Sequence, residues 1–161
     1  MVIGVLSDSH DRLPETRAAV TLLLRHGAKA LIHCGDLTGQ DVVDCLVGEV
    51  PAYFVFGNND WDRDGLARYA ADLGVTCLGT HGVIDLGGRK IGVAHGDVLR
   101  LLTELEHTPD LRYLLSGHTH VSDDESDGLL RRVNPGALHR TRQKSVCTID
   151  LAADAVRFHL L

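Results

Sequence analysis

LLSGHTHVSD, residues 114–123, begins as an apolar run typical of a buried strand and then places His118 and His120 two positions apart. Side chains at positions i and i+2 of an extended segment point to the same side. Both imidazoles are therefore expected to face one spot just beyond the end of the strand. This arrangement predicts that the strand end holds a bound ligand.

Residues suited to ligand binding also follow four other strand-like runs of the chain. Because ligands of open parallel sheets bind outside the carboxyl ends of the strands, the five segments are expected to converge at one edge. Their donors are oxygen and imidazole without thiolate, a set that suits divalent ions such as manganese, iron, nickel or zinc. The donors are Asp8 and His10 after residues 2–6, Asp36 after 30–34, Asn58, Asn59 and Asp60 after 52–56, and His95 near the end of 90–97.

Each of these donors has an ordinary structural explanation when it is taken alone. Asp36 could cap the following helix, and the segment SDSHD at residues 7–11 could cap the helix that begins near Pro14. The segment GNND at residues 57–60 could be a simple turn. A single histidine such as His95 is more often a hydrogen-bonded loop residue than a ligand. Coincidence at five strand ends is nevertheless the weaker explanation, and we favour one shared site.

The pattern of predicted secondary structure changes near residue 73. Before it, short apolar runs alternate with helical patterns, which predicts right-handed crossovers and a mainly parallel sheet. After it, hairpin-like pairs dominate, with turns at Gly87–Gly88, at Asp127–Gly128 and at residues 152–154. Units of this kind predict two packed sheets flanked by helices. No linker, repeat or low-complexity tract divides the chain, so we expect a single domain over residues 1–161.

Composition limits the classes of partner that this chain can serve. The formal net charge of -6 argues against nucleic-acid binding, which needs a basic footprint, although bound cations would reverse the sign locally. The 4 cysteines form no CxxC pair, which argues against both a disulfide framework and a thiolate zinc site. The N-terminal apolar run has no basic flank and is too short to span a bilayer. We therefore expect a cytoplasmic protein with reduced thiols and no membrane partner.

The ligand-bearing segments, taken in chain order, resemble the signature of the calcineurin-like metallophosphoesterases. Asn134 to Ala137, NPGA, is also similar to an element of that family. The short chain without an inserted cap resembles the small bacterial and archaeal phosphodiesterases of the superfamily. The resemblance implies an α/β fold, a four-layer α/β/β/α sandwich with two central mixed sheets. The segments are Asp8-Ser9-His10, Gly35-Asp36, Gly57-Asn58-Asn59-Asp60, His95-Gly96 and Gly117-His118-Thr119-His120.

The resemblance also implies two divalent transition-metal ions and a small phosphate diester as substrate. Manganese is the first candidate for the metal, followed by iron, nickel or zinc. Asp36 would bridge the ions, and a hydroxide held between them would attack phosphorus in line. By position, the ligands of the first ion would be Asp8, His10, Asp36 and His120. Those of the second ion would be Asp36, Asn58, His95 and His118.

One position departs from the family pattern. Asn59 stands where much of the superfamily has the histidine that stabilises or protonates the leaving oxygen. An amide can donate a hydrogen bond but cannot deliver a proton at neutral pH. We therefore predict faster turnover of diesters with acidic leaving groups, with Asp60 in an orienting role.

Other residues are expected to support the site or to lie outside it. Asn134 and Gly136 are predicted to support the metal ligands through hydrogen bonding and a tight turn, and Arg140 is a candidate phosphate contact. Two other functions remain open at this point: a non-catalytic scaffold similar to the retromer subunit of this superfamily, and a nuclease. A homo-oligomer is also open. Surface or core-edge positions are expected for His26, His33, His81, His107 and His159.

Overall fold

The computed structural model describes all of residues 1–161, which form eleven strands and four helices. The elements are β1 (Val2–Leu6), α1 (Leu13–Arg25), β2 (Leu31–His33), α2 (Gln40–Leu46), β3 (Ala52–Phe54), α3 (Arg63–Asp72), β4 (Thr76–Cys77), β5 (His81–Leu86), β6 (Arg89–Ala94), α4 (Leu99–Glu106), β7 (Leu111–Leu115), β8 (Ser122–Ser126), β9 (Arg131–Pro135), β10 (Ser145–Asp150) and β11 (Ala155–Leu160).

The first sheet has the strand order β11-β10-β1-β2-β3-β4. Strands β1 to β4 are parallel and are joined through α1, α2 and α3, as the alternating pattern of the first half predicts. The C-terminal hairpin of β10 and β11 extends this sheet, with β10 antiparallel to β1. The short edge strand β4 has only two residues, and the sequence pattern does not reveal it.

The second sheet has the order β5-β6-β7-β9-β8 and is also mixed. Strand β7 runs parallel to both β6 and β9, whereas β5 and β8 pair antiparallel with their neighbours. The predicted turn at Gly87–Gly88 joins β5 to β6. Both glycines have positive φ, 57° and 72°, which a two-residue hairpin loop requires and which glycine adopts without strain.

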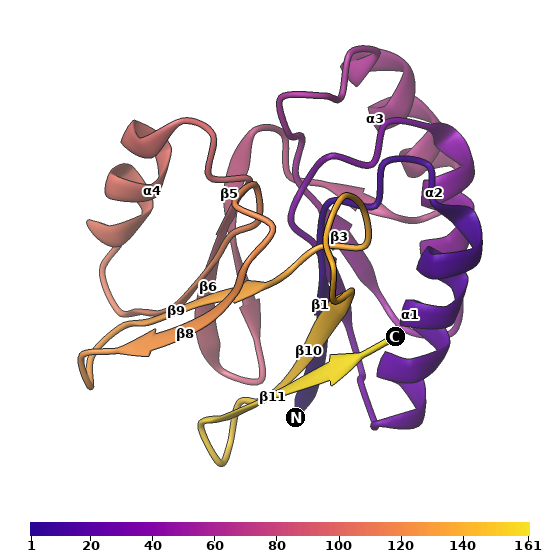
Figure 1. The fold of residues 1–161 in the computed structure, drawn as a ribbon. Helices are drawn as coiled ribbons and strands as arrows, with labels where there is room; N and C mark the ends of the chain where they lie inside the picture. The colour runs from indigo at the N-terminus through magenta and orange to yellow at the C-terminus, as the bar shows by residue number, and fades with distance from the viewer.

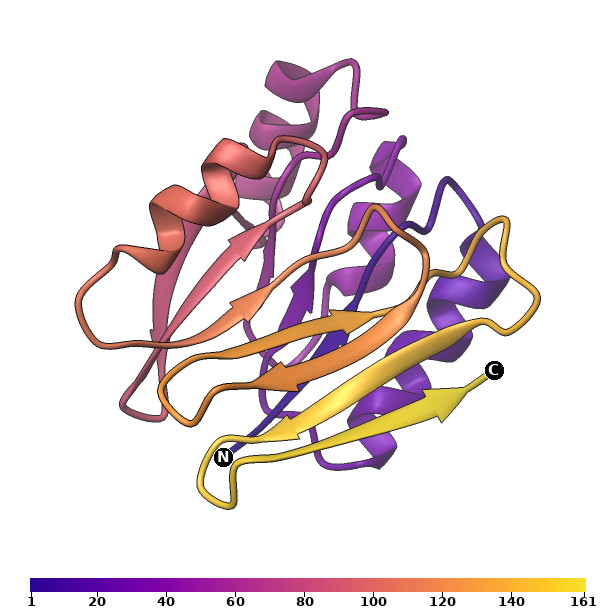
Figure 2. The same cartoon turned by 60° about the vertical axis from the view of Figure 1, so that its left-hand side comes forward.

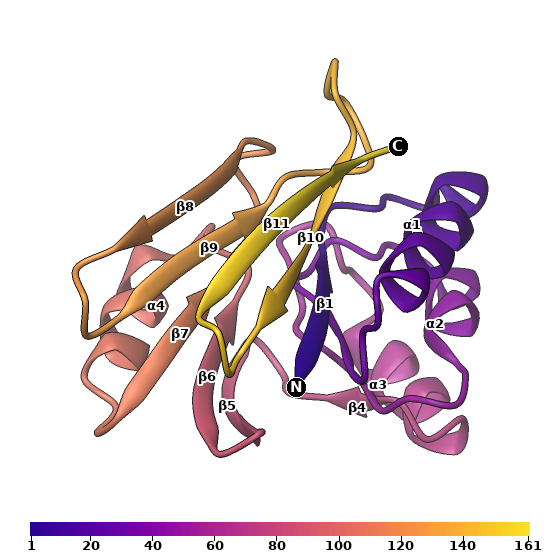
Figure 3. The same ribbon diagram turned by 90° about the horizontal axis from the view of Figure 1, so that it is seen from below.

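Three separate hydrophobic cores show that the fold has four layers. One core lies between α1, α2 and α3 and the first sheet, and includes Leu23, Phe54 and Leu66. A second fills the space between the two sheets, where Tyr113 and Ile149 are fully buried. The third lies under α4 on the outer face of the second sheet. Figures 1 and 3 show the helices on the two outer sides, with the sheets between them. The predicted α/β/β/α sandwich is confirmed.

Helix α1 shows how local sequence places these layers. Pro14 lies in its first turn, where the missing N–H has no intrahelical partner in any case. Ala19 and Leu23, four residues apart, are fully buried against the sheet. Gly27, with φ 87°, follows the end of the helix and allows the chain to turn back into β2. No helix in the fold has the length and apolar character that crossing a membrane would require.

The acidic segment at residues 123–127 forms most of an edge strand and leads into the turn predicted at Asp127–Gly128. Residues Ser122–Ser126 form the exposed edge strand β8, and the turn falls at Asp127–Gly128. Figure 2 shows the hairpin of β8 and β9 in orange, and Figure 3 shows β8 at the outer side of β9. Charged side chains on an edge strand discourage pairing with a second chain. Asp124 also forms an ion pair with Arg131 on β9, with Nε–Oδ1 2.7 Å.

A charged group ties the two sheets together at the end opposite the ligand-bearing loops. Asp154, in the turn between β10 and β11, contacts Arg112 of β7 and Arg131 of β9. The hydroxyl of the fully buried Tyr113 donates to Asp154 Oδ1 at 2.6 Å. These contacts join the first sheet to the second.

Candidate metal centre

The predicted ligand residues lie in the loops that follow β1, β2, β3, β6 and β7. The N-terminus lies at the lower end of β1 in Figure 1, so the carboxyl end of that strand points upward in the view. The parallel arrangement of β1, β2 and β3 and of β6 and β7 brings the loops together. The prediction that polar strand ends share one edge agrees with this topology.

Two carboxylates and three imidazoles form a compact cluster at this edge. His120 Nε2 lies 3.1 Å from Asp8 Oδ1. The Nε2 atoms of His10 and His95 lie 3.4 Å and 3.3 Å from Asp36 Oδ2. His95 Nε2 is also 3.9 Å from Asp8 Oδ1. Ligand atoms within 4.8 Å of one another form two groups, Asp8 with His10 and His120, and Asp8 with Asp36 and His95.

Three buried atoms of this cluster have no hydrogen-bond partner: Asp8 Oδ1, His10 Nε2 and His95 Nε2. A buried polar atom without a partner costs free energy, and native folds rarely leave several together. All three belong to the donor types that bind divalent transition metals. The cluster therefore fits a bound cation, which would satisfy all three atoms.

The remaining atoms of two ligands are already engaged, which fixes the direction of the free ones. His95 Nδ1 lies 2.8 Å from the carbonyl oxygen of Cys34 and donates to it, because a carbonyl can only accept. In the neutral ring that a metal would bind, the lone pair of His95 is therefore on Nε2, which faces the carboxylates. Asp8 Oδ2 accepts from the Ser7 hydroxyl at 2.6 Å and from the backbone N–H of His118 at 3.1 Å. This leaves Asp8 Oδ1 directed at the cluster.

Asp36 is held by Asn59. The backbone N–H of Asn59 donates to Asp36 Oδ1 at 2.8 Å, and its side-chain amide donates to Oδ2 at 2.7 Å. Burial alone would raise the pKa of Asp36, but the contact with His95 and the hydrogen bonds from Asn59 hold it well below its usual range. Burial would lower the pKa of His95, and the neighbouring carboxylates Asp36 and Asp8 raise it to about 9.

Two predicted ligands lie less deeply in the cluster. The Asn58 side chain is exposed on its turn, and no hydrogen bond joins it to the other candidates. His118 is exposed, with its ring centroid 5.2 Å from that of His95. His120, by comparison, faces Asp8, and its ring lies 6.0 Å from that of His10.

The backbone of the ligand loops corrects one expectation. Residues 118 and 120 are not extended: β7 ends at Leu115, and His118 and His120 have φ of 67° and 60°. The alternation of an extended strand therefore does not apply, and the two rings approach different partners. Asp8, His10 and Asp36 also have positive φ, of 52°, 42° and 59°. Non-glycine residues in this region are strained and concentrate at functional sites.

The family comparison identifies this arrangement. A model of the calcineurin-like phosphoesterase superfamily domain matches residues 1–154. The chain belongs to this family. It is 28% identical over 142 residues to a phosphodiesterase of Methanocaldococcus jannaschii, covering 84% of this chain and 83% of that protein.

Solved structures of other proteins share the fold. A structure described as a novel archaeal phosphodiesterase has a TM-score of 0.90 and 24% identity, with both chains covered completely. Vps29 from Entamoeba histolytica has a TM-score of 0.65 and 19% identity, covering 100% of this chain and 98% of that one. Both comparisons concern the fold alone, because both identities are below 25%.

Asp60 links two ligand loops of this phosphoesterase domain through hydrogen bonds. Its side chain is 2% exposed and accepts three backbone N–H groups: Asp36 at 3.0 Å, Thr38 at 2.7 Å and Gly57 at 2.7 Å. Burial raises the pKa of Asp60, while the N–H groups of Gly57 and Thr38 oppose that effect. This position agrees with the orienting role predicted for Asp60.

Asn134 links a third ligand loop to strand β9 through hydrogen bonds. Its side-chain amide donates to Gly117 O at 2.8 Å and to the Thr119 hydroxyl at 3.1 Å. Its own oxygen accepts the N–H of Gly136, whose φ is 85°. Asn134 thus connects the end of β9 to the loop that carries the paired histidines. Arg140 lies in the next loop, is exposed and has φ 48°.

Two histidines that the sequence did not assign to the site contribute to it. His33 is fully buried at the end of β2; its Nδ1 accepts the N–H of Gly35, and its Nε2 lies 2.9 Å from the Ser9 hydroxyl. Burial, together with the nearby charge of His95, lowers the pKa of His33 to about 3. A polar residue inside the apolar run 30–34 was the available signal. His139 packs its ring 4.7 Å from that of His10.

Proposed function

We propose that this chain is a phosphodiesterase that uses two divalent metal ions, with manganese the first candidate. The observation that carries the proposal is the group of buried, unpartnered ligand atoms on Asp8, His10 and His95 between two carboxylates. An ordinary loop cluster would pair these atoms with each other or with backbone. A cation would satisfy all of them at once.

The motif positions support ligand sets for two ions, and Asp36 would belong to both sets. When bound, the two ions would stabilise charge on the phosphoryl oxygens and lower the pKa of a coordinated water toward about 7. The first ion would be held by Asp8, His10, Asp36 and His120. The second ion would be held by Asp36, Asn58, His95 and His118.

The charge of the site favours an anionic substrate despite the acidic chain. Asp8 and Asp36 contribute -2, and two divalent ions would contribute +4, which leaves about +2 at the centre. The imidazoles and the Asn58 amide add no negative charge. A singly charged phosphate diester would therefore be attracted to this edge of a protein whose net charge is -6.

A preference for acidic leaving groups is expected from Asn59, which lies beside the bridging carboxylate. Asn59 donates both of its hydrogen bonds to Asp36 and has no proton to deliver to a leaving oxygen. Its role in this proposal is to hold the bridging carboxylate in place. Diesters with acidic leaving groups need no such proton, and the relative in Methanocaldococcus jannaschii carries the name phosphodiesterase.

The scaffold alternative has less support from this chain. A protein that uses the fold only for assembly has no need for unpaired imidazoles in a buried centre, and this chain keeps an imidazole at all four expected positions, His10, His95, His118 and His120. The nuclease alternative lacks a stacking stripe of aromatic residues.

Metal analysis combined with hydrolysis of bis-p-nitrophenyl phosphate tests the proposal. Two ions per chain and manganese-dependent turnover are expected. His120→Ala should lower kcat at least ~100-fold, as loss of a metal ligand does, while the melting temperature of the chelated protein stays unchanged. His107→Ala, on an exposed histidine after α4, is the matched control and should behave as the parent. Full activity in the folded His120→Ala variant would refute the ligand assignment.

A further inference from the structure

Three arginines without acidic partners gather beside the candidate metal centre. Arg12 precedes α1, and Arg140 and Arg142 lie in the loop between β9 and β10. The ion pairs of this protein that involve arginine use Arg112, Arg131 and Arg132, none of which lies in these two segments. No carboxylate therefore neutralises the guanidinium groups of Arg12, Arg140 and Arg142.

Arg12 is held against the centre by His139. Its Nε donates to His139 Nδ1 at 3.2 Å, and the ring of His139 lies 4.7 Å from the ring of the candidate ligand His10. Because Nδ1 accepts, the His139 proton is on Nε2 and the ring is neutral. The terminal nitrogens of Arg12 have no partner in the protein and are free to donate to an anion.

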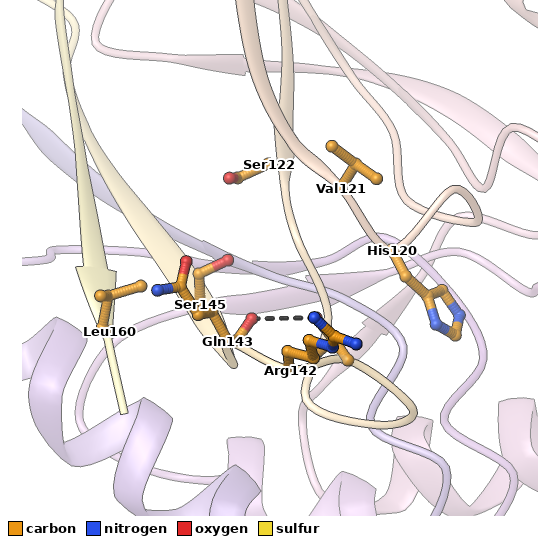
Figure 4. Close-up of a pocket in the computed structure, with 8 residues that line it drawn as sticks. His120, Val121, Ser122, Arg142, Gln143, Ser145 and Leu160 are labelled. Carbon is orange, nitrogen blue, oxygen red and sulfur yellow. Dashed lines mark hydrogen bonds between the residues drawn. The ribbon is translucent and has the colours of Figure 1, made fainter.

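Arg142 lines a pocket that begins at another candidate ligand. The pocket has a volume of about 380 Å³ and is bounded by His120, Val121 and Ser122 on one side and by the 141–145 loop on the other. Figure 4 shows Arg142 projecting from that loop on the side of the pocket where His120 lies. This volume lies within the range of ~300–1,000 Å³ that is usual for small-molecule sites. Only two of its eight lining residues are hydrophobic, which suits a sugar-like group better than a lipid chain.

We propose that Arg12, held by His139, and Arg142, in the adjoining pocket, form a subsite that binds a second phosphate group on the substrate. This inference rests on the proposed function. The substrate class is then a phosphate diester in which one alcohol arm is a sugar-sized polar group that carries a phosphate of its own. The guanidinium fork matches phosphate oxygens in two parallel hydrogen bonds.

The scissile phosphate does not account for these arginines. In the proposed function the charge of the two ions would already exceed the single charge of that phosphate. Arg12 and Arg142 lie beyond His10 and His120, the two ligands on the first-ion side. Guanidinium groups at these positions are suited to bind a negatively charged substituent of the substrate. Arg140, exposed beside His139, adds to the positive potential of the same rim.

The test compares two substrates that differ only in the second phosphate: thymidine 5′-(p-nitrophenyl phosphate) with a free 3′-hydroxyl or with a 3′-phosphate. In the parent, kcat/KM for the 3′-phosphorylated substrate should exceed that for the 3′-hydroxyl substrate by about tenfold or more. This is the effect of one charge-assisted hydrogen-bonded pair. Arg12→Gln and Arg142→Gln should each reduce that ratio to within about threefold of unity. Arg100→Gln, which removes an exposed arginine of α4, is the control and should keep the ratio.

Equal kcat/KM for the two substrates in the parent, or an unchanged ratio in both arginine variants, would overturn the subsite. Calorimetric binding of thymidine 3′,5′-bisphosphate against thymidine 5′-monophosphate to the chelated protein gives a second readout. Both ligands carry the 5′-phosphate, so the ratio of their dissociation constants isolates the second phosphate. If neither substrate is hydrolysed, the proposed function fails, and the calorimetric ratio alone decides whether the arginines bind a phosphate.

Discussion

Asp60→Asn separates the orienting role of Asp60 from metal binding itself. Asp60 Oδ2 accepts the N–H groups of Asp36 and Gly57, and Oδ1 accepts that of Thr38. An asparagine has the same shape but only one accepting oxygen. If that oxygen keeps the two bonds of Oδ2, the new amide meets the N–H of Thr38 donor to donor, where the present distance is 2.7 Å.

The magnitude follows from this lost bond. A hydrogen bond to a charged acceptor contributes about 1.5–3 kcal/mol, and a buried N–H left unpaired costs a similar amount. Removing the buried charge offsets part of the loss, because burial disfavours the ionised carboxylate, as its raised pKa indicates. We expect a net loss of about 2 kcal/mol in the free energy of unfolding, or about 4–8 °C in melting temperature for a domain of this size.

Denaturant unfolding of the chelated protein measures this loss without metal. Asp62→Asn is the matched control, because Asp62 caps α3 through a single bond to Gly65 N–H, and asparagine caps a helix about as well as aspartate. The control should lose less than about 0.5 kcal/mol. Manganese affinity should fall in Asp60→Asn and not in Asp62→Asn. Equal unfolding midpoints and equal metal affinity for both variants would refute the idea that Asp60 fastens the ligand loops.

Three further predictions concern the leaving group, a close backbone contact and the tie between the sheets. Because Asn59 cannot protonate a leaving oxygen, the ratio of kcat for methyl p-nitrophenyl phosphate to kcat for dimethyl phosphate should be larger in the parent than in Asn59→His. Equal ratios in the two proteins would contradict this. Gly57→Ala would force a Cβ into Asp36 Oδ1, so manganese affinity measured by calorimetry should fall at least ~10-fold. Unchanged affinity would show that the loop moves to accommodate the methyl group and would contradict this prediction. Asp154→Asn should cost about 1 kcal/mol in urea unfolding at pH 7, a modest value because Asp154 is 38% exposed. The Tyr113 hydroxyl, opposed by burial, holds the pKa of Asp154 below its ordinary 3.8, so the difference from the parent should be full above about pH 4 and shrink at lower pH.

The position of the site could be predicted from sequence because it depends on topology. Parallel strands place their carboxyl ends at one edge, and the chain marks those ends with ligand residues such as Asp8, Asp36 and His95. The two-sheet architecture follows similarly from the alternation of helices and hairpins. The edge strand β4 was missed because two residues are too few for a periodic pattern.

The local geometry could not be predicted in the same way. The expectation that His118 and His120 share a face assumed an extended backbone, whereas both residues are left-handed. Periodicity rules describe regular strands and give no warning of such loops. His139 was missed for a different reason: it lies about 130 residues from His10 in sequence and meets it only because β10 returns to pair with β1.

The non-ligand residues of the motifs explain why these loops keep a strained shape. A non-glycine residue with positive φ costs of order 1–3 kcal/mol, and the ligand loops contain several. Asp60 joins the loop after β2 to the turn after β3, and Asn134 joins the loop after β7 to the end of β9. Each therefore opposes relaxation of two segments at once. The fourth residue of GNND and the first of NPGA thus act through backbone geometry, and they position the candidate ligands without being candidate ligands themselves.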